Sequence, residues 1–140
     1  MTSMTETIAA PPGRGAILAG WALTGLVLAF LLFDAAIKIV GHPAVGETAA
    51  TLGWPIDVGF WRAIGLMLLA CAALYAWPRT AILGAIVLTG YLGGAIATHV
   101  RIANPLFSHT LFGVYLGVIL WAALWLRMPA LRALLPVGRS

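Results

Sequence analysis

Charged residues are scarce in this sequence. Only 9% of its 140 residues are Asp, Glu, Lys or Arg, whereas 62% are hydrophobic, and the mean hydropathy is +1.02. A soluble globular domain carries about a quarter charged residues, so this composition excludes a water-soluble globule. The eight basic residues lie singly at the ends of hydrophobic runs. Nucleic-acid binding needs a clustered basic face, and scattered basic residues instead orient helices in a membrane.

Residues for redox and metal chemistry are scarce as well. The single cysteine, Cys71, excludes an intrachain disulfide and a CxxC redox pair. His42, His99 and His109 lie in or beside predicted loops, so no two of them face each other inside a bundle as haem ligation requires. The spacing of a zinc site, a phosphate loop, a Rossmann fingerprint or a Ser-His-Asp triad is also absent. We therefore expect no metal site.

Four long apolar stretches dominate the chain. Each is close to the roughly 20 apolar residues that cross a bilayer, and the first is too long for a cleavable signal peptide. The predicted transmembrane helices are residues 16–40, 58–76, 81–99 and 106–126. The sequence therefore predicts an all-α membrane protein, a four-helix bundle over residues 16–127. Residues 1–15 are predicted to form a disordered cytoplasmic tail and residues 128–140 a short cytoplasmic tail.

The connection between the first two spans predicts a short amphipathic helix at the membrane interface, starting at Pro43 and stopping at Gly53. Four spans put both termini on one side of the membrane. That side collects Arg14, Arg79, Arg127, Arg132 and Arg139. The other side has Lys38, Arg62 and Arg101, offset by Glu47 and Asp57. Because basic residues accumulate on the cytoplasmic side, we expect both termini in the cytoplasm.

The third span is unusually rich in small residues. Its glycines are Gly84, Gly90, Gly93 and Gly94. Small residues four apart let helices approach closely, so these glycines predict a packing face. Such a face brings the third span against the first span or, alternatively, joins two copies of the chain in a homo-oligomer.

Two charges interrupt the end of the first span. Asp34 and Lys38 are spaced i, i+4 and lie on one helix face. Asp34 is only ~9 Å from the middle of the span at 1.5 Å per residue, which places it inside the hydrocarbon core. Ionisable residues at that depth are expensive and often functional. The alternative is a self-neutralised pair that fixes the rotation of the helix.

The polar end of the third span lies at the same depth as this pair. With His99 and Arg101, the pair makes a candidate site for an anion, a quinone head group or the polar edge of a partner protein. Asp34 and His99 are the candidate acid or base, and Tyr91 is a candidate to line a ring-binding pocket. The alternative is ordinary interface decoration, because such residues also settle at helix ends.

Three segments resemble the DoxX-like family of small bacterial membrane proteins. They are LFDAAIKIV, LYAWPRTAILGAIVLTGYLGGAIATHVR and FSHTLFGVYLGVILWAALWLR, and the resemblance covers about residues 16–136. The matching positions are Asp34, Lys38, Pro78, Arg79, Gly90, Tyr91, Gly93, Gly94, His99 and Arg101. One departure is Leu68, which stands where family members often carry a glutamate.

The resemblance implies a four-helix bundle in the bacterial cytoplasmic membrane. Namesakes of the family are linked to quinone-dependent sulfur oxidation and to respiratory complexes, so quinone is the implied cofactor and a membrane redox protein the implied partner. Three functions stay open. They are an accessory or quinone/lipophile-binding subunit of a membrane redox system, a small membrane enzyme acting on an apolar substrate inside the bundle, and a purely structural partner-binding subunit.

Overall fold

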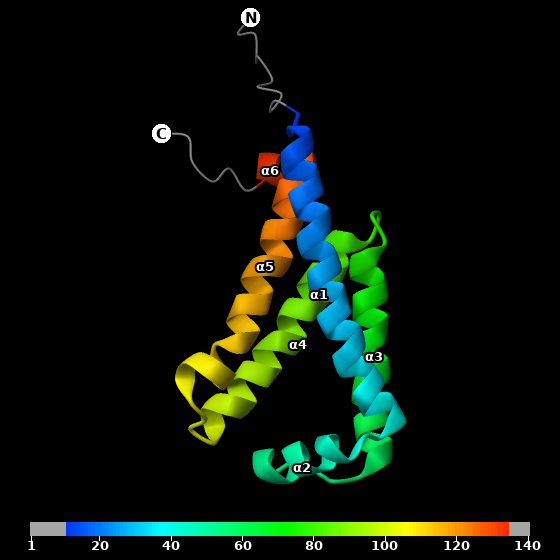
Figure 1. Ribbon diagram of the computed structural model, residues 1–140, viewed down its shortest axis with the longest axis vertical. Coiled ribbons are helices and arrows are strands. Elements are labelled where there is room, and N and C mark those ends of the chain that lie inside the picture. The colour runs from blue at the N-terminus through cyan, green and yellow to red at the C-terminus, as the bar shows by residue number, and fades with distance from the viewer. Residues whose placement is uncertain (1–10, 135–140) are drawn as a thin grey trace, which may run out of the picture.

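The computed structural model describes residues 11–134 and is helical throughout its regular elements (Figure 1). These elements are α1 (Arg14–Val40), α2 (Pro43–Leu52), α3 (Val58–Ala76), α4 (Ala81–Arg101), the π-helix η1 (Leu106–Thr110), α5 (Phe112–Arg127) and α6 (Pro129–Leu134). Four stretches are long and apolar enough to cross a membrane: α1, α3, α4, and η1 together with α5. The predicted all-helical fold with four membrane spans is confirmed, and these spans imply contact with a lipid bilayer.

The boundaries differ from the predicted ones at a few places. α1 begins at Arg14 and α4 continues to Arg101, because a charged residue in a terminal turn does not end a helix. A short helix, α6, follows α5 where the sequence analysis expected only a tail. Most of the predicted tail 1–15, and residues 135–140 of the predicted tail 128–140, lie outside the described residues.

Glycines terminate the helices on both sides of the first loop. Gly41 ends α1 at φ 72° and Gly53 ends α2 at φ 67°, a left-handed conformation that glycine adopts without a steric penalty. Pro43 starts α2 at the first helical position, as predicted from its fixed φ. The chain therefore turns once before α2 and once after it, and α2 lies across one end of the bundle (Figure 1).

The four long helices form a ring in which α1 and α4 each pack against both α3 and α5. α1 and α4 are therefore diagonal to one another. The core contains large fully buried side chains from all four helices: Val27, Leu31, Leu68, Tyr75, Leu88, Leu120 and Leu124. α1 begins and α5 ends at the same end of the bundle, with α6 beside them, and α2 lies at the opposite end (Figure 1).

The close approaches between helices occur at glycines, but mostly not at the predicted ones. A Cβ atom at Gly84 would lie 2.3 Å from the backbone nitrogen of Tyr75, so α3 and α4 touch backbone to backbone at this point. Gly65 brings α3 against the Ala35 carbonyl of α1 in the same way, at 2.9 Å. Glycine is required at such contacts because any side chain would push the helices apart.

Three of the four glycines predicted to form a packing face do not pack. A Cβ at Gly90, Gly93 or Gly94 would meet no atom within 4 Å. The reason is that α3 and α4 meet at their tight hairpin, near Gly84, and diverge along their length towards α2 (Figure 1). The expected close packing of α4 on α1 is therefore corrected: the two helices are diagonal, and the glycines in the second half of α4 face open space.

Candidate functional site

The divergence of the helices leaves a cavity of about 510 Å³ in the half of the bundle nearest α2. α1, α3, α4 and α5 contribute its walls, α2 spans its end, and His109 of η1 lies on its border. Its volume is within the range of ligand pockets, which is roughly 300–1,000 Å³. The lining is mostly apolar and includes the aromatic side chains Phe30, Trp54, Phe60, Trp61 and Phe112.

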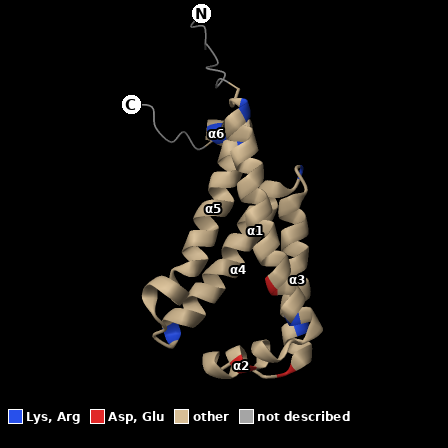
Figure 2. Ribbon diagram, in the orientation of Figure 1, with Lys and Arg blue, Asp and Glu red and all other residues tan. Residues whose placement is uncertain are grey.

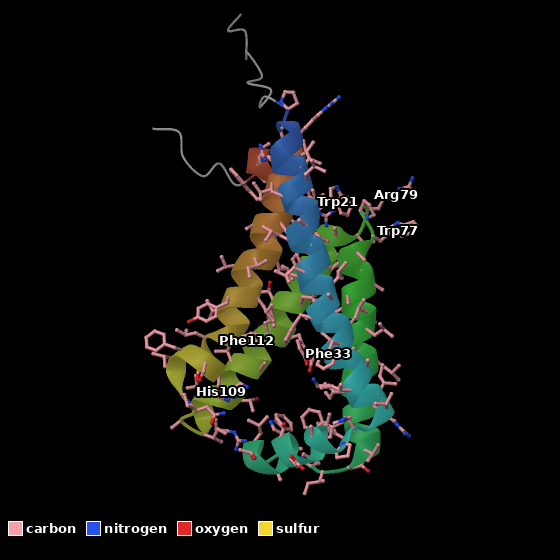
Figure 3. The ribbon with its side chains drawn as sticks, in the orientation of Figure 1. Trp21, Phe33, Trp77, Arg79, His109 and Phe112 are labelled. Atoms are coloured by element: carbon pink, nitrogen blue, oxygen red, sulfur yellow. The ribbon has the colours of Figure 1, made fainter. Side chains whose placement is uncertain are left out.

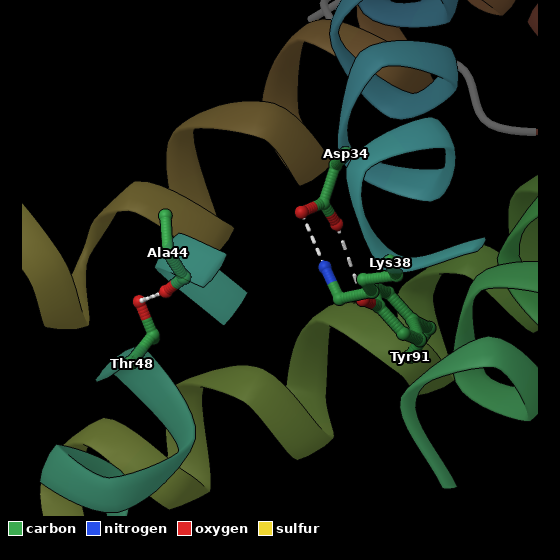
Figure 4. Close-up of polar contacts among 5 residues, drawn as sticks. All are labelled: Asp34, Lys38, Ala44, Thr48 and Tyr91. Carbon is green, nitrogen blue, oxygen red and sulfur yellow. Dashed lines mark hydrogen bonds and ion pairs between the residues drawn. The ribbon is translucent and has the colours of Figure 1, made fainter. Parts of the chain in front are cut away.

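A polar cluster on one wall joins the two diagonal helices. Lys38 pairs directly with Oδ1 of Asp34 on α1, and the hydroxyl of Tyr91 on α4 donates to Oδ2 of the same carboxylate over 3.3 Å (Figure 4). The i, i+4 spacing on α1 places both charges on the helix face that turns towards α4. All three residues line the cavity, and the Asp34 and Lys38 side chains are only 24% and 11% exposed.

The cluster is electrically neutral but still offers hydrogen-bond donors. Lys38 has three N–H donors, and Asp34 is the acceptor recorded for it within residues 11–134. Asp34 accepts from two donors, so its carboxylate is not a free acid or base. The sequence left a buried ionisable site and a self-neutralised pair open as alternatives. The structure combines them, because the pair is closed on itself and also borders the cavity.

A pair of histidines forms a second polar group on the same cavity. The rings of His99 and His109 lie 5.9 Å apart between centroids, and both residues line the cavity. Nδ1 of His99 lies 2.7 Å from Nδ2 of Asn104, and Nδ1 of His109 lies 2.7 Å from Oγ of Ser108. Because both Nδ1 atoms are engaged locally, Nε2 is the nitrogen of each ring left for a ligand.

The approach of His109 to His99 corrects the expectation that no two histidines face each other. Neither this approach nor the contact of Asn104 could be recognised from the sequence. A turn after α4, with Ala103 at φ 52°, folds the chain back so that the Asn104 amide nitrogen bonds to the His99 carbonyl over 3.1 Å. The π-helix η1 then carries His109 (Figure 3), whose ring comes close to that of His99. The only signal in the sequence is that an asparagine follows the end of a span, which is common at helix ends. π-Helices themselves are frequent at functional sites.

Arg101 does not join the other candidate residues. Its Nη2 donates to the carbonyl of Leu52, in the last turn of α2, and its guanidinium lies beside Gly53. A cation on the C-terminal carbonyls of a helix is favourable because those carbonyls have no partner within the helix. Of the polar residues predicted for the site, the structure brings Asp34, Lys38, Tyr91 and His99 around one cavity. It directs Arg101 to the end of α2.

The glycines of α4 contribute space to the cavity. Gly90 and Gly94 line it, whereas Gly93, on another face of α4, does not. Because Gly90 and Gly94 carry no side chain, the part of the cavity beside α4, between Tyr91 and His99, is not filled. Within residues 11–134, no group of three or more His, Cys, Asp or Glu side chains could hold a metal ion.

The sequence model of the DoxX-like family matches residues 22–123, which is more than half of the chain. The chain belongs to the DoxX-like family. In this DoxX-like protein, the matched segment begins in α1 and ends in α5, so it includes every cavity residue described above. No curated protein and no solved structure matches the chain.

Leu68 stands at the position where the resemblance led us to expect a glutamate. Its side chain is fully buried in the core, in the same cluster as Leu31 and Leu88, and it does not line the cavity. A carboxylate at this point would be buried without the partners that Asp34 has. The apolar residue therefore suits the core in which it lies.

Proposed function

We propose that this DoxX-like protein binds a lipophilic small molecule with an uncharged polar head, of which quinone is the leading example. In this proposal it serves as an accessory subunit of a redox system in the bacterial cytoplasmic membrane. The observation that carries the proposal is the cavity of about 510 Å³ between the membrane-spanning helices, with apolar walls and the Asp34–Lys38–Tyr91 cluster on one of them. A mostly apolar cavity between membrane-spanning helices suits molecules that partition into the bilayer.

The chemistry of the lining supports an uncharged head group. Each Å² of apolar surface removed from water contributes roughly 25 cal/mol of favourable free energy, so apolar walls favour a ligand with a lipophilic body. Asp34 and Lys38 neutralise one another, so the cluster has no net charge with which to compensate a charged ligand. A Lys38 N–H can still donate to a carbonyl or hydroxyl oxygen of the ligand.

The residues present fit a quinone ring. Lys38 can donate to one carbonyl, Nε2 of His99 or His109 can face another polar atom, and the aromatic lining offers faces for ring contact. A bound quinone would supply the electron-carrying chemistry. The chain's own side chains would hold and orient the ring, while the Asp34 carboxylate stays engaged by Lys38 and Tyr91.

Charge distribution supports an orientation for this binding site. Among the described residues, the α6 end of the bundle carries only basic charges, whereas the α2 end carries both signs (Figure 2). The positive-inside rule then favours a cytoplasmic α6 end with both termini in the cytoplasm. The cavity would lie towards the opposite, non-cytoplasmic side, where a redox partner protein would reach it.

A matched pair of glycine variants tests ligand binding. Gly94→Leu places a side chain in the cavity, at a position where an added Cβ meets no neighbouring atom within 4 Å. Gly93→Leu adds the same side chain on a face outside the cavity, where a Cβ is equally free. Titration of the purified protein with a short-chain quinone, followed by tryptophan fluorescence, should saturate for the native chain and for Gly93→Leu. We expect at least a tenfold weaker affinity for Gly94→Leu. Absence of saturable binding by the native chain would refute the proposal, and so would unchanged affinity in both Gly94→Leu and His99→Ala.

The enzyme alternative receives less support from the geometry. An acid or base inside the bundle needs a carboxylate that can exchange a proton with the substrate. Asp34 is instead paired with Lys38 and accepts a hydrogen bond from Tyr91. Conversion of a lipophilic substrate by the purified protein, abolished in Asp34→Asn, would establish the enzyme in place of the binding subunit.

A further inference from the structure

A buried cation lies at the end of the bundle away from the cavity. Arg127, in the last turn of α5, is 9% exposed, and its Nε and Nη2 atoms are completely buried. Neither nitrogen has a hydrogen-bond partner among the described residues. Lys38, a partly buried basic side chain in another span, has Asp34 as its direct partner. Arg127 is therefore a cation enclosed by the bundle with an unsatisfied pair of donors.

The two unsatisfied nitrogens lie along one edge of the guanidinium. Nε–H and the neighbouring Nη2–H point the same way and form a fork that matches two oxygens of one oxyanion. If crowding alone prevented hydrogen bonding, any of the guanidinium donors could be left unpaired. Here the unpaired donors are the two that bind a phosphate or carboxylate side-on.

The contacts that Arg127 does make leave this edge unused. Its guanidinium carbon lies 4.2 Å from the ring centroid of Trp21 and 5.9 Å from that of Tyr75. Both contacts are with aromatic rings, and although the Tyr75 hydroxyl lies near the guanidinium, Nε and Nη2 are left without a partner in the described part of the chain. The free energy lost by removing an unpaired cation from water is larger than the free energy gained from contacts with aromatic rings. These contacts therefore do not explain why a charged side chain is buried at this position.

The surroundings offer the cation no acidic side chain. The described acidic residues are Asp34, Glu47 and Asp57, and all lie in the half of the molecule towards α2 (Figure 2). The α6 end instead adds the basic residues Arg14, Arg79 and Arg132. Within residues 11–134 the one ion pair is that of Lys38 with Asp34. The oxyanion for Arg127 must therefore come from outside this part of the chain.

We propose that Arg127 binds a phosphate-type oxyanion, and that the phosphate of an anionic phospholipid is its ordinary source. Arg127 ends a membrane-spanning helix, at the depth where lipid head groups begin. Trp21 on α1 (Figure 3) lies against the guanidinium, is 46% exposed and is not part of the buried core cluster, so its displacement would admit a phosphate without disturbing that cluster. The site is at the other end of the bundle from the cavity and does not depend on the proposed function.

The test uses the opposite effects of one substitution with and without lipid. Arg127→Met keeps an apolar stem of similar length but removes the charge. In a neutral detergent alone its thermal unfolding midpoint should equal or exceed that of the native chain, because an unpaired buried charge is gone. Short-chain phosphatidylglycerol should raise the midpoint of the native chain and leave that of Arg127→Met unchanged. The exposed Arg14 is the matched control, and Arg14→Met should keep the response.

Further arms identify the source of the phosphate. Diacylglycerol with the same acyl chains lacks the phosphate and should not change the unfolding midpoint. In a separate arm without lipid, sodium phosphate replaces sodium chloride at equal ionic strength. If sodium phosphate alone reproduces the shift, the source is free phosphate; if only phosphatidylglycerol does so, it is the lipid. Glu6→Gln should keep the lipid response. If this variant loses the response, the partner of Arg127 is the chain's own carboxylate and the proposal is overturned.

Two outcomes contradict the oxyanion site directly. One is that Arg127→Met lowers the midpoint equally with and without phosphatidylglycerol, and the other is that it keeps the lipid response. Should Arg127→Met fail to fold, Arg127→Lys retains the charge but not the fork. Native mass spectrometry should then show about tenfold weaker phosphatidylglycerol binding, the loss of roughly one charge-assisted hydrogen bond. Unchanged binding in Arg127→Lys would also overturn the proposal.

Discussion

The contact at Gly84 yields the sharpest prediction for the stability of the bundle. In Gly84→Ala the added Cβ would lie 2.3 Å from the Tyr75 nitrogen, 2.5 Å from its Cα and 2.7 Å from the Leu74 carbonyl carbon. All three are backbone atoms, so no side chain can rotate to relieve the overlap. α3 and α4 must move apart at the hairpin where they pack most closely.

The expected magnitude follows from two opposing terms. Overpacking in a tight core costs typically 1–3 kcal/mol, and a backbone contact at this distance is at the upper end, about 3 kcal/mol. Alanine recovers about 1 kcal/mol over glycine through its higher helix propensity. Gly84→Ala should therefore lose about 2 kcal/mol of unfolding free energy. Gly93→Ala, where a Cβ meets no atom within 4 Å, should gain up to ~1 kcal/mol.

The measurement compares these two variants, since they make the same chemical change in the same helix. Their unfolding free energies should differ by about 3 kcal/mol, which corresponds to roughly 6–12 °C in unfolding midpoint for a chain of this size. Reversible unfolding in detergent, followed by circular dichroism, gives both quantities. If Gly84→Ala is as stable as Gly93→Ala, then the backbone contact between α3 and α4 is not what holds the hairpin together.

Three further variants examine the polar contacts. Tyr91→Phe removes the hydrogen bond between the diagonal helices and should cost about 0.5–1.5 kcal/mol of unfolding free energy, with weaker quinone binding; unchanged values in both measurements would contradict the cluster. Lys38→Met leaves the Asp34 carboxylate without its cation and should destabilise the protein by about 2–4 kcal/mol, and the double variant with Asp34→Asn should recover most of this loss in a chemical denaturation series. Arg101→Gln removes the donor to the Leu52 carbonyl, so amide hydrogen exchange should accelerate in α2 and not in α3; equal protection before and after would show that α2 is held by other contacts.

Local patterns were sufficient to predict the four spans and α2, although not the short helices η1 and α6. Apolar runs of span length, Pro43 and Gly53 predicted the four spans and α2, because bilayer thickness and backbone geometry act on each segment separately. The pairing of Asp34 with Lys38 also follows from sequence, since residues four apart share a helix face whatever the helix packs against. These inferences need no knowledge of neighbouring helices.

Only the tertiary structure decided which of the similar residues do which task. Gly84 and Gly93 look alike in sequence, yet one touches the backbone of α3 and the other faces open space, because α3 and α4 diverge from their hairpin. Arg101 and Arg127 both end a span, yet one reaches α2 and the other is enclosed beside Trp21. Helix crossing and rotation depend on contacts between residues far apart in the chain, and no local pattern encodes them. The cavity, which exists only where the helices separate, is determined at the same level.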